Sequence, residues 1–265
     1  MNIGTFYFCE TKQGFWSVMM NMKRILILSV PLALTGCAHL EIGLSHGFGG
    51  HQGTKGNGKP QEVSRPVAEF DKIEVGSAFQ VEATEGPLSP LKVSADSNLL
   101  SQIKTEVKNR TLKVWVEGSM STSSPQKISF STPRINSFVA SGATETNLKL
   151  ASNHAFNLDI SGASKVTVKG TVSSLDCDLS GASRAIFGTM SMTKLKASLC
   201  GASQLAIKGS TEVLEAELSG ASVIDGGLAG KEAIVSMSGS SRAKFGPFAK
   251  VSKDLSGASN ASFGN

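Results

Sequence analysis

The feature that most constrains the fold of this chain is a short motif of small residues, mostly Ser-Gly-Ala-Ser, that recurs through its second half. The motif glycines are separated by 20, 19, 20, 19, 19 and 18 residues. They are Gly142, Gly162, Gly181, Gly201, Gly220, Gly239 and Gly257. A nearly constant period of this length is typical of repeat proteins in which similar units stack on one another. The sequence therefore predicts a solenoid with a unit of about 19 residues.

Apolar and polar residues alternate on both sides of the motif, which predicts one β-strand before it and another after it. Around Gly162, for example, apolar residues stand at positions 156, 158 and 160 and again at 166 and 168. A unit with two or three short strands cannot bury its own apolar face. Stacking the next unit at the inter-strand spacing buries that face and pairs the backbone groups of both units. We therefore expect an all-β domain folded as a parallel β-helix.

The motif itself is best interpreted as the corner of each rung. Corner residues of successive rungs lie above one another, so small side chains fit best, and Gly also adopts positive φ without penalty. The last Ser of the motif, as in Ser183, Ser203, Ser222 and Ser259, would form a hydrogen-bonding ladder along the stack. A set of serine nucleophiles is the alternative, but no His or Lys recurs at a constant offset to activate them. We expect structural glycines and no catalytic residues.

Charged residues show a second regularity, at positions that face away from the predicted core. Acids stand three residues before several motif glycines, and bases stand three residues after others. The acids are Asp159, Asp178, Glu217 and Asp254, and the bases are Lys165, Arg184 and Arg242. Two interpretations are open. The columns form exposed ion pairs across the corner, each below ~1 kcal/mol, or they line a carbohydrate or calcium groove along Asp159 and Asp178, which would repel each other on adjacent rungs.

Residues 1–36 are interpreted as an upstream extension followed by a signal peptide. Lys23 and Arg24 precede an apolar run that is too short to span a bilayer comfortably. The run ends in Leu-Thr-Gly-Cys, which resembles a bacterial lipobox, so Cys37 is the predicted lipidation site and membrane anchor. Ala38 follows it, and we expect the lipid to be held in the outer membrane.

Residues 37–64 are Gly-rich and polar, and they are predicted to be a flexible tether to a folded domain at 65–265. Gly53, Gly58 and Lys59 match part of a phosphate-binding loop, but a proline replaces the Ser or Thr that would bind magnesium, and no apolar strand precedes the loop. Three histidines of the tether region lack the acid or Cys neighbours that would complete a metal site. We expect no metal and no cofactor.

Within the folded domain, residues 65–138 are predicted to be less regular rungs, and residues 139–265 are predicted to be the regular ones. Because terminal repeats need capping, the irregular half is expected to close the first end of the solenoid. Apolar residues at helical spacing predict a short helix between residues 98 and 108. The C-terminal sequence shows no cap, so we expect an open end that could pair with another copy of the chain.

The charge balance argues against a nucleic-acid partner. The formal net charge is +5, and residues 1–36 contribute Lys12, Lys23 and Arg24 against Glu10, which leaves +3 for the remainder. Acids and bases are interleaved along that remainder, which is typical of a solvated surface of mixed charge.

The order of the segments between residues 66 and 264 resembles a known family. FDKIEVGSAFQVEATEG is followed by LKVSADSNLL, then by TLKV and then by the repeated SGAS motif. This order is similar to that of the putative auto-transporter adhesin, head GIN domain family. The resemblance implies a single-stranded, right-handed parallel β-helix and export as a lipoprotein of a Gram-negative bacterium. It implies no catalytic residue.

The expected function is therefore that of an adhesin-like, non-enzymatic protein, anchored in the membrane, that binds a glycan or a protein at the cell envelope or surface. Two alternatives stay open. One is a polysaccharide lyase or hydrolase that uses the acid group of Asp159, Asp176 and Asp178, and it requires Asp176 and Asp178 to share an outward face with Lys196 or Arg184. The other is a purely structural envelope protein.

Overall fold

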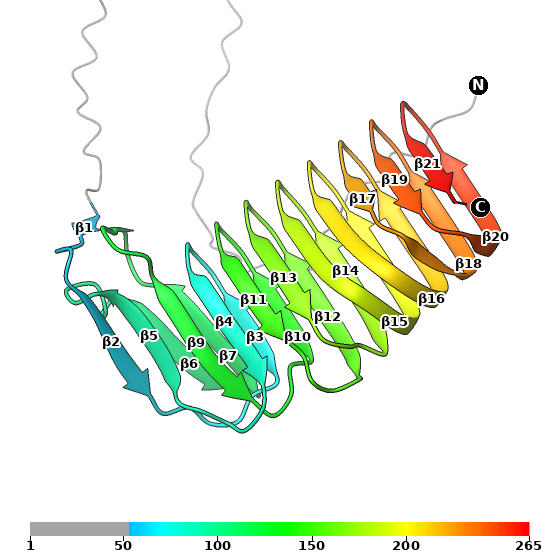
Figure 1. Cartoon of the computed structure of the whole chain (residues 1–265). Helices are drawn as coiled ribbons and strands as arrows, with labels where there is room; N and C mark the ends of the chain where they lie inside the picture. The colour runs from blue at the N-terminus through cyan, green and yellow to red at the C-terminus, as the bar shows by residue number, and fades with distance from the viewer. Residues whose placement is uncertain (1–52, 265) are drawn as a thin grey trace, which may run out of the picture. The chain divides into compact units, whose positions relative to one another are not determined.

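The computed structural model describes residues 53–264, which form a stack of β-strand layers (Figure 1). These residues contain 21 strands and no helix. Strands about 19 residues apart in the chain pair in parallel, for example Asp159 with Asp178 and Lys165 with Arg184. The predicted all-β solenoid with rungs of about 19 residues is confirmed.

Each regular rung has one strand before the Gly corner and one strand after it. The pre-corner strands are β3 (Lys72–Val75), β10 (Ser137–Ala140), β12 (Ala155–Ile160), β14 (Ser174–Leu179), the second parts of β15 (Arg184–Leu199) and β16 (Gln204–Leu218), β18 (Leu228–Met237) and β20 (Phe248–Leu255). The post-corner strands are β4 (Gln80–Glu85), β11 (Glu145–Lys149), β13 (Lys165–Lys169), the first parts of β15 and β16, β17 (Val223–Asp225), β19 (Arg242–Phe245) and β21 (Asn260–Phe263). β15 and β16 each continue from one rung into the next without a break.

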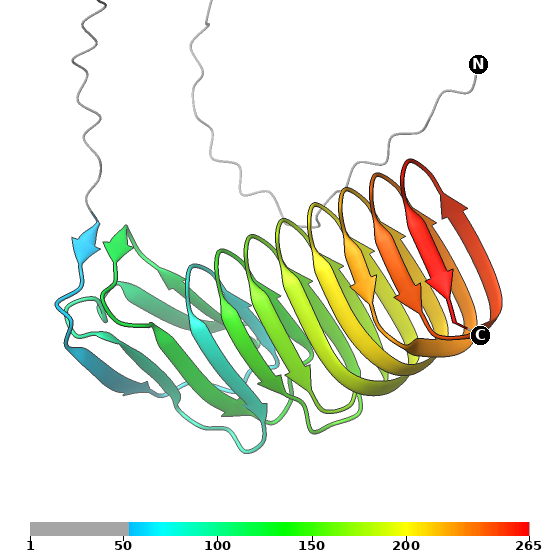
Figure 2. The ribbon, with the colours of Figure 1, turned by 45° about the horizontal axis from the view of Figure 1, so that its top comes forward.

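The corners lie in a single file along the stack, as the aligned loops in Figure 2 show. At Gly201 the backbone has φ +78°, and a Cβ atom there would lie 2.6 Å from the carbonyl oxygen of Gly181. That same oxygen accepts a hydrogen bond of 2.8 Å from the N–H of Ala202. The other six motif glycines have φ between +69° and +88° and equally close approaches. Only Gly satisfies both the positive φ and the close contact.

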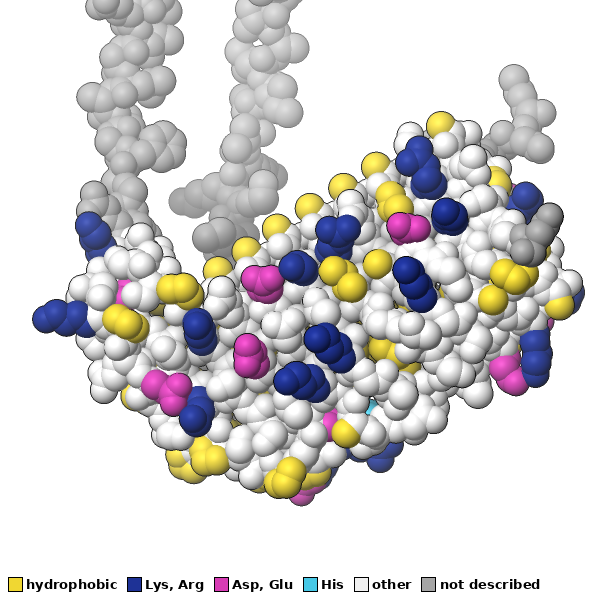
Figure 3. Space-filling model, in the orientation of Figure 1, with side chains coloured by type: hydrophobic (Ala, Val, Ile, Leu, Met, Phe, Trp, Pro, Cys, Tyr) yellow, Lys and Arg dark blue, Asp and Glu magenta, His cyan; other side chains and the backbone are white. Residues whose placement is uncertain are grey.

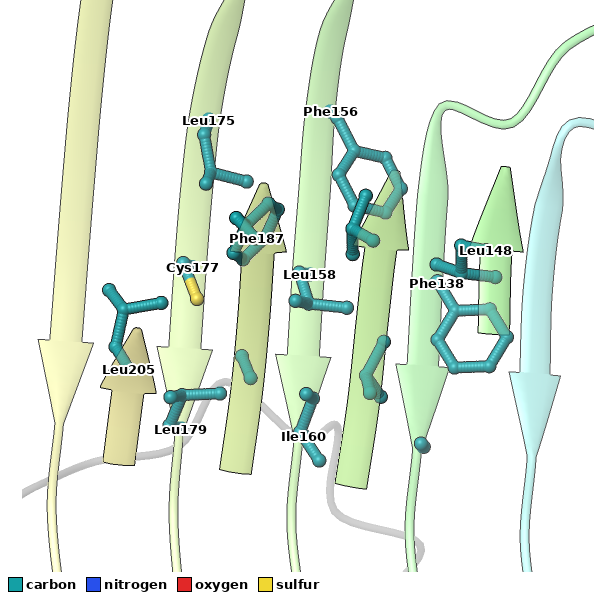
Figure 4. Packing of buried hydrophobic residues seen from close by; sticks show 14 of the residues in the cluster. Phe138, Leu148, Phe156, Leu158, Ile160, Leu175, Cys177, Leu179, Phe187 and Leu205 are labelled. Atoms are coloured by element: carbon teal, nitrogen blue, oxygen red, sulfur yellow. The ribbon is translucent and has the colours of Figure 1, made fainter. Parts of the chain in front are cut away.

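The core lies between the two strand layers. Inward side chains of successive rungs pack side by side, and Figure 4 shows Phe138, Phe156, Leu158 and Cys177 among them. All four are at most 1% exposed. The last Ser of the corner motif also points inward, and Ser183, Ser203 and Ser222 are fully buried. The Ser203 and Ser222 hydroxyl oxygens are 3.4 Å apart, whereas Ser222 also donates to the Ser219 carbonyl oxygen at 2.7 Å.

The first end of the stack is closed by a cap of seven strands. Its strands are β1 (Thr54–Lys55), β2 (Pro60–Arg65), β5 (Leu91–Asp96), β6 (Ile103–Lys108), β7 (Thr111–Val116), β8 (Met120–Ser121) and β9 (Lys127–Thr132). β7 and β9 add a parallel layer to β3 and β4, whereas β2, β5 and β6 pair in antiparallel fashion. The chain thus builds β1 and β2 of the cap, then one rung with β3 and β4, then the rest of the cap, and returns with β10 to the free side of β3.

The predicted helix between residues 98 and 108 is wrong. Residues 103–108 form β6, which pairs antiparallel with β7 through a two-residue turn at Asn109 and Arg110. Both turn residues have positive φ, at 51° and 60°, which is the geometry of a type I′ hairpin turn. Apolar residues at 103 and 107 fit a strand and a helix equally well, so spacing alone could not distinguish them.

The predicted tether extends too far, because residues 53–64 belong to the cap. β2 pairs with β5 over its whole length, and the segment before it packs on Asp96. The buried Asp96 carboxylate accepts hydrogen bonds from the Ser123 N–H at 2.9 Å and the Ser124 hydroxyl at 2.7 Å. These hydrogen bonds hold the pKa of Asp96 below its usual value. In the segment of the rejected phosphate-loop match, Gly56 and the backbone N–H of Gly58 lie against this carboxylate, whereas Gly53 lies against Ser119.

A second buried acid, Glu85, joins the end of β4 to the loops of the next two rungs. Its carboxylate accepts three backbone hydrogen bonds, from Ile135 at 2.8 Å, Ala151 at 2.7 Å and Ser152 at 2.8 Å. The buried His154 ring lies 3.4 Å from the same carboxylate. Because burial makes each of these hydrogen bonds costly to lose, Glu85 fixes the position of the first rung relative to those that follow.

The last described rung carries a charge where the other rungs carry core residues. Lys253 of β20 is paired in register with Val235 of β18, which is fully buried. A rung of another copy stacked on β20 would bury this ammonium group without a partner. An inward-facing charge is a known protection of exposed strand edges. The end-to-end pairing of copies stays a prediction, and it would have to accommodate this ammonium group.

Candidate functional site

The outward side chains form two faces of opposite sign. We call the outward side chains of the post-corner strands, with β9, the post-corner face, and those of the pre-corner strands, with β7, the pre-corner face. Because residues one period apart are in register, each charge forms part of a column that runs from rung to rung. The signs of these columns decide which ligands each face can attract.

The post-corner face is basic, and Figure 3 looks onto it. Its eight basic residues are Lys127, Lys149, Lys165, Lys169, Arg184, Lys208, Arg242 and Lys244, all exposed. Its three acidic residues are Glu82, Glu145 and Asp225. One ion pair neutralises a base on this face, between Lys165 and Glu145 at 3.1 Å. The other seven bases make no ion pair with the described residues.

The pre-corner face is acidic, and most of its bases are neutralised by acids of the same face. Its eight acids are Glu74, Asp159, Asp176, Asp178, Glu215, Glu217, Glu232 and Asp254, and its five bases are Lys72, Lys113, Lys194, Lys196 and Lys250. Three of the bases pair with acids of neighbouring strands, at Lys113–Glu74, Lys194–Glu215 and Lys250–Glu232. The bases that lack an ion pair with the described residues are Lys72 and Lys196.

The two predicted columns thus lie on different faces. The acidic column lies on the pre-corner face, where Ser198 and Ser236 interrupt it, and the basic column lies on the post-corner face, where Gln204 and Val223 interrupt it. No ion pair among residues 53–264 joins the two columns across the corner. The ion pairs instead connect neighbouring strands within one face, since register brings those side chains together.

Asp159 and Asp178 lie side by side on adjacent rungs, and Asp176 lies beside Lys196 on the same face. Burial raises the pKa of Asp159, and the nearby Asp178 charge raises it further. Arg184 lies beyond the corner, on the other face. The described residues contain no group of three His, Cys, Asp or Glu side chains placed to hold a metal ion. This acidic cluster lies on an open strand surface, outside the two hollows described next.

The post-corner face has a hollow of about 270 Å³ over β4, β11 and β13. Two columns line it, with Glu82, Asn147 and Thr167 in one and Thr84, Lys149 and Lys169 in the other. A second hollow, of about 480 Å³, follows the return side of the rungs from Asn153 to Lys231, and half of its lining residues are Ser or Thr. Lys149 and Lys169 were not predicted as site residues, although both stand seven residues after a motif glycine.

These observations define the class of protein, a capped parallel β-solenoid with one basic and one acidic face. Residues 69–265 match the family described as "Putative auto-transporter adhesin, head GIN domain", and the chain belongs to this family. The expected family membership is thereby confirmed. No curated protein matches the chain. Residues 53–264 include no helix that could cross a membrane.

Three crystal structures of bacterial proteins share the fold. A putative adhesin from Parabacteroides merdae has a TM-score of 0.69 at 16% identity, covering 81% of this chain and 100% of its own. A protein described as a putative lipid binding protein, from Parabacteroides distasonis, has a TM-score of 0.70 at 16% identity with the same coverage. A putative adhesin from Bacteroides fragilis has a TM-score of 0.67 at 17% identity, covering 80% of this chain and 100% of its own.

Proposed function

We propose that this protein is an adhesin-like, non-enzymatic binding protein of the bacterial envelope that presents its solenoid to a glycan or protein partner. The observation that carries the proposal is the rung register, which repeats the same exposed charges along one face. Such an array suits ligands that repeat a chemical group, because weak contacts add along the length of the stack. The names of the structural relatives, two putative adhesins and one putative lipid binding protein, support a binding role.

The lyase or hydrolase alternative finds little support in the geometry. The condition of that alternative is met, because Asp176 and Asp178 share a face with Lys196, and Arg184 lies on the other face. The three carboxylates lie outside both hollows, whereas a glycosidase places its carboxylates on either side of the bound sugar chain. The structural-protein alternative predicts no ligand at all, so a binding experiment separates it from the proposal.

The binding proposal is tested with the purified full-length protein on an array of bacterial and host glycans and on immobilised envelope proteins. We expect saturable binding to at least one ligand class, and binding should weaken as salt rises because the charges are exposed. If no glycan and no envelope protein is retained at low salt, the protein is a structural component and the proposal fails.

We further propose that Cys37 carries a lipid that anchors the protein in the outer membrane. Cys37 and the preceding signal sequence lie outside the described residues, so this part of the proposal rests on the Leu-Thr-Gly-Cys sequence and the apolar run before it. Labelling cells with an alkyne fatty acid should mark the wild-type protein in the outer-membrane fraction. The Cys37→Ala variant should lose the label, and a labelled Cys37→Ala protein would refute the assignment.

A further inference from the structure

We propose that the hollow on the post-corner face binds a carboxylated polysaccharide, and that Lys149 and Lys169 provide the ammonium groups that hold its carboxylates. This inference rests on the proposed function and specifies its ligand class and its site. Lys149 of β11 and Lys169 of β13 are direct register partners on adjacent parallel strands. Both are exposed and both line the hollow.

The two lysines are placed unfavourably unless an anion lies between them. Like charges directly opposite each other on neighbouring strands are destabilising. Two lysines elsewhere on the solenoid are neutralised by an acid of the neighbouring strand, Lys165 by Glu145 and Lys194 by Glu215. Neither Lys149 nor Lys169 makes an ion pair with a described carboxylate. An external anion would therefore supply the charge that neighbouring strands supply elsewhere.

The rest of the lining fits a sugar chain. Asn147, Thr84 and Thr167 present amide and hydroxyl groups, which exchange hydrogen bonds with sugar hydroxyls in either direction. Glu82 is the single acid of the lining, and it can accept hydrogen bonds from those hydroxyls. Successive rungs repeat at roughly 4.8 Å, a spacing similar to that of sugar units in an extended polysaccharide. The ligand would then lie along the stack, with its carboxylates toward the lysine column.

The composition of the face favours a polysaccharide over a nucleic acid. Proteins that bind single-stranded nucleic acid stack the bases on aromatic side chains. The outward positions of β4, β11, β13 and of the first parts of β15 and β16 contain no aromatic residue. A polyanion at this site would therefore be held by charge and by hydrogen bonds. A carboxylated sugar provides both, through its carboxylate and its hydroxyl groups.

The test measures binding of the full-length protein to polygalacturonate, with fully methyl-esterified polygalacturonate as the uncharged control. The K149Q/K169Q double variant removes both charges of the hollow. The matched control is K72Q/K196Q, which removes two lysines of the pre-corner face that also lack ion pairs with the described residues. We expect roughly a tenfold or greater loss of affinity for K149Q/K169Q, because two exposed charge contacts are lost, and less than a twofold change for K72Q/K196Q.

Three results would overturn the inference. These are equal binding of the esterified polymer, equal losses in the two double variants, and equally tight binding of single-stranded DNA with the same lysine dependence. If polygalacturonate fails to bind while the glycan or envelope-protein array gives saturable binding, this inference fails and the proposed function stands. If neither experiment gives binding, both fail.

Discussion

The two faces of the solenoid share one backbone plan and differ only in the side chains at their outward positions. On the pre-corner face, three of the five bases are neutralised by acids of neighbouring strands. On the post-corner face, a single ion pair leaves seven bases without a described acidic partner. The comparison teaches that the register, set by the corners, creates the columns, whereas the residues within a column decide whether its charge is available to a ligand.

The largest loss of stability is expected from a substitution at a corner, because the corners set the strand register of both faces. In Gly201→Val, a β-branched side chain would meet the Gly181 carbonyl oxygen and would also have to adopt φ +78°. We expect a loss of about 3 kcal/mol or more in the free energy of unfolding, measured by urea denaturation. Ala202→Val, at the exposed neighbouring corner position, is the control and should change it by less than about 0.5 kcal/mol. Equal stability of the two variants would contradict the stacked-corner account.

The next effect concerns Glu85, which is buried and belongs to neither face. Glu85→Ala leaves three backbone N–H groups without their acceptor, so we expect the variant to lose about 3 kcal/mol or more of stability. Amide hydrogen exchange should accelerate at Ile135, Ala151 and Ser152 before it does so in the later rungs. Uniform acceleration over the whole stack would show that Glu85 does not act locally. Variants that are used to compare the charges of the two faces should therefore keep Glu85 and its hydrogen bonds.

A smaller effect is expected on the acidic face at Asp159. Its pKa is raised in the folded protein by burial and by Asp178, so its ionisation opposes folding at neutral pH. Asp159→Asn should therefore stabilise the protein at pH 7 by a few tenths to about 1 kcal/mol. The gain should vanish below the ordinary pKa of an aspartate, where the wild-type carboxyl is protonated in both states. Asp254→Asn, whose register partner is Ser236, should show no such gain in urea denaturation at either pH.

The smallest effects should come from the ion pairs within each face. The Lys194–Glu215 pair on the pre-corner face and the Lys165–Glu145 pair on the post-corner face are both substantially exposed. Double-mutant cycles with Met for Lys and Gln for Glu should give coupling energies below about 1 kcal/mol for both. Similar values would show that the faces differ in available charge and not in stability. A coupling above 2 kcal/mol on one face would contradict that conclusion.

The regular part of this fold could be predicted from the sequence because each rung repeats the same pattern of a strand, a corner of small residues and a second strand. Positions 181 and 201 require Gly because the backbone has positive φ there and because successive corners lie in close contact. The recurrence of Gly at a nearly constant period in the sequence indicates both constraints. The cap could not be predicted in this way. Its antiparallel pairings depend on a hairpin turn at Asn109 and Arg110 and on the buried acids Asp96 and Glu85, which occur once and have no period.

The candidate site was predicted only in part for a similar reason. Offsets from the motif glycine placed the acidic and basic columns correctly on outward positions, but they could not tell that the corner separates the columns onto two faces. Lys149 and Lys169 were missed because positions seven residues after the glycine lie at the end of the post-corner strand, where the rungs vary most. The structure shows that these two lysines are direct register partners and that neither makes an ion pair with a described carboxylate.

The most direct test of the claim that an anionic ligand binds the basic post-corner face and not the acidic pre-corner face is lysine footprinting of the full-length protein. The protein is acetylated with and without saturating polygalacturonate, and the modified lysines are quantified by mass spectrometry. The account predicts that the polymer protects Lys149 and Lys169, while Lys72 and Lys196 react at the same rate in both samples. Protection of Lys72 and Lys196 instead, or equal protection of all four, would contradict it.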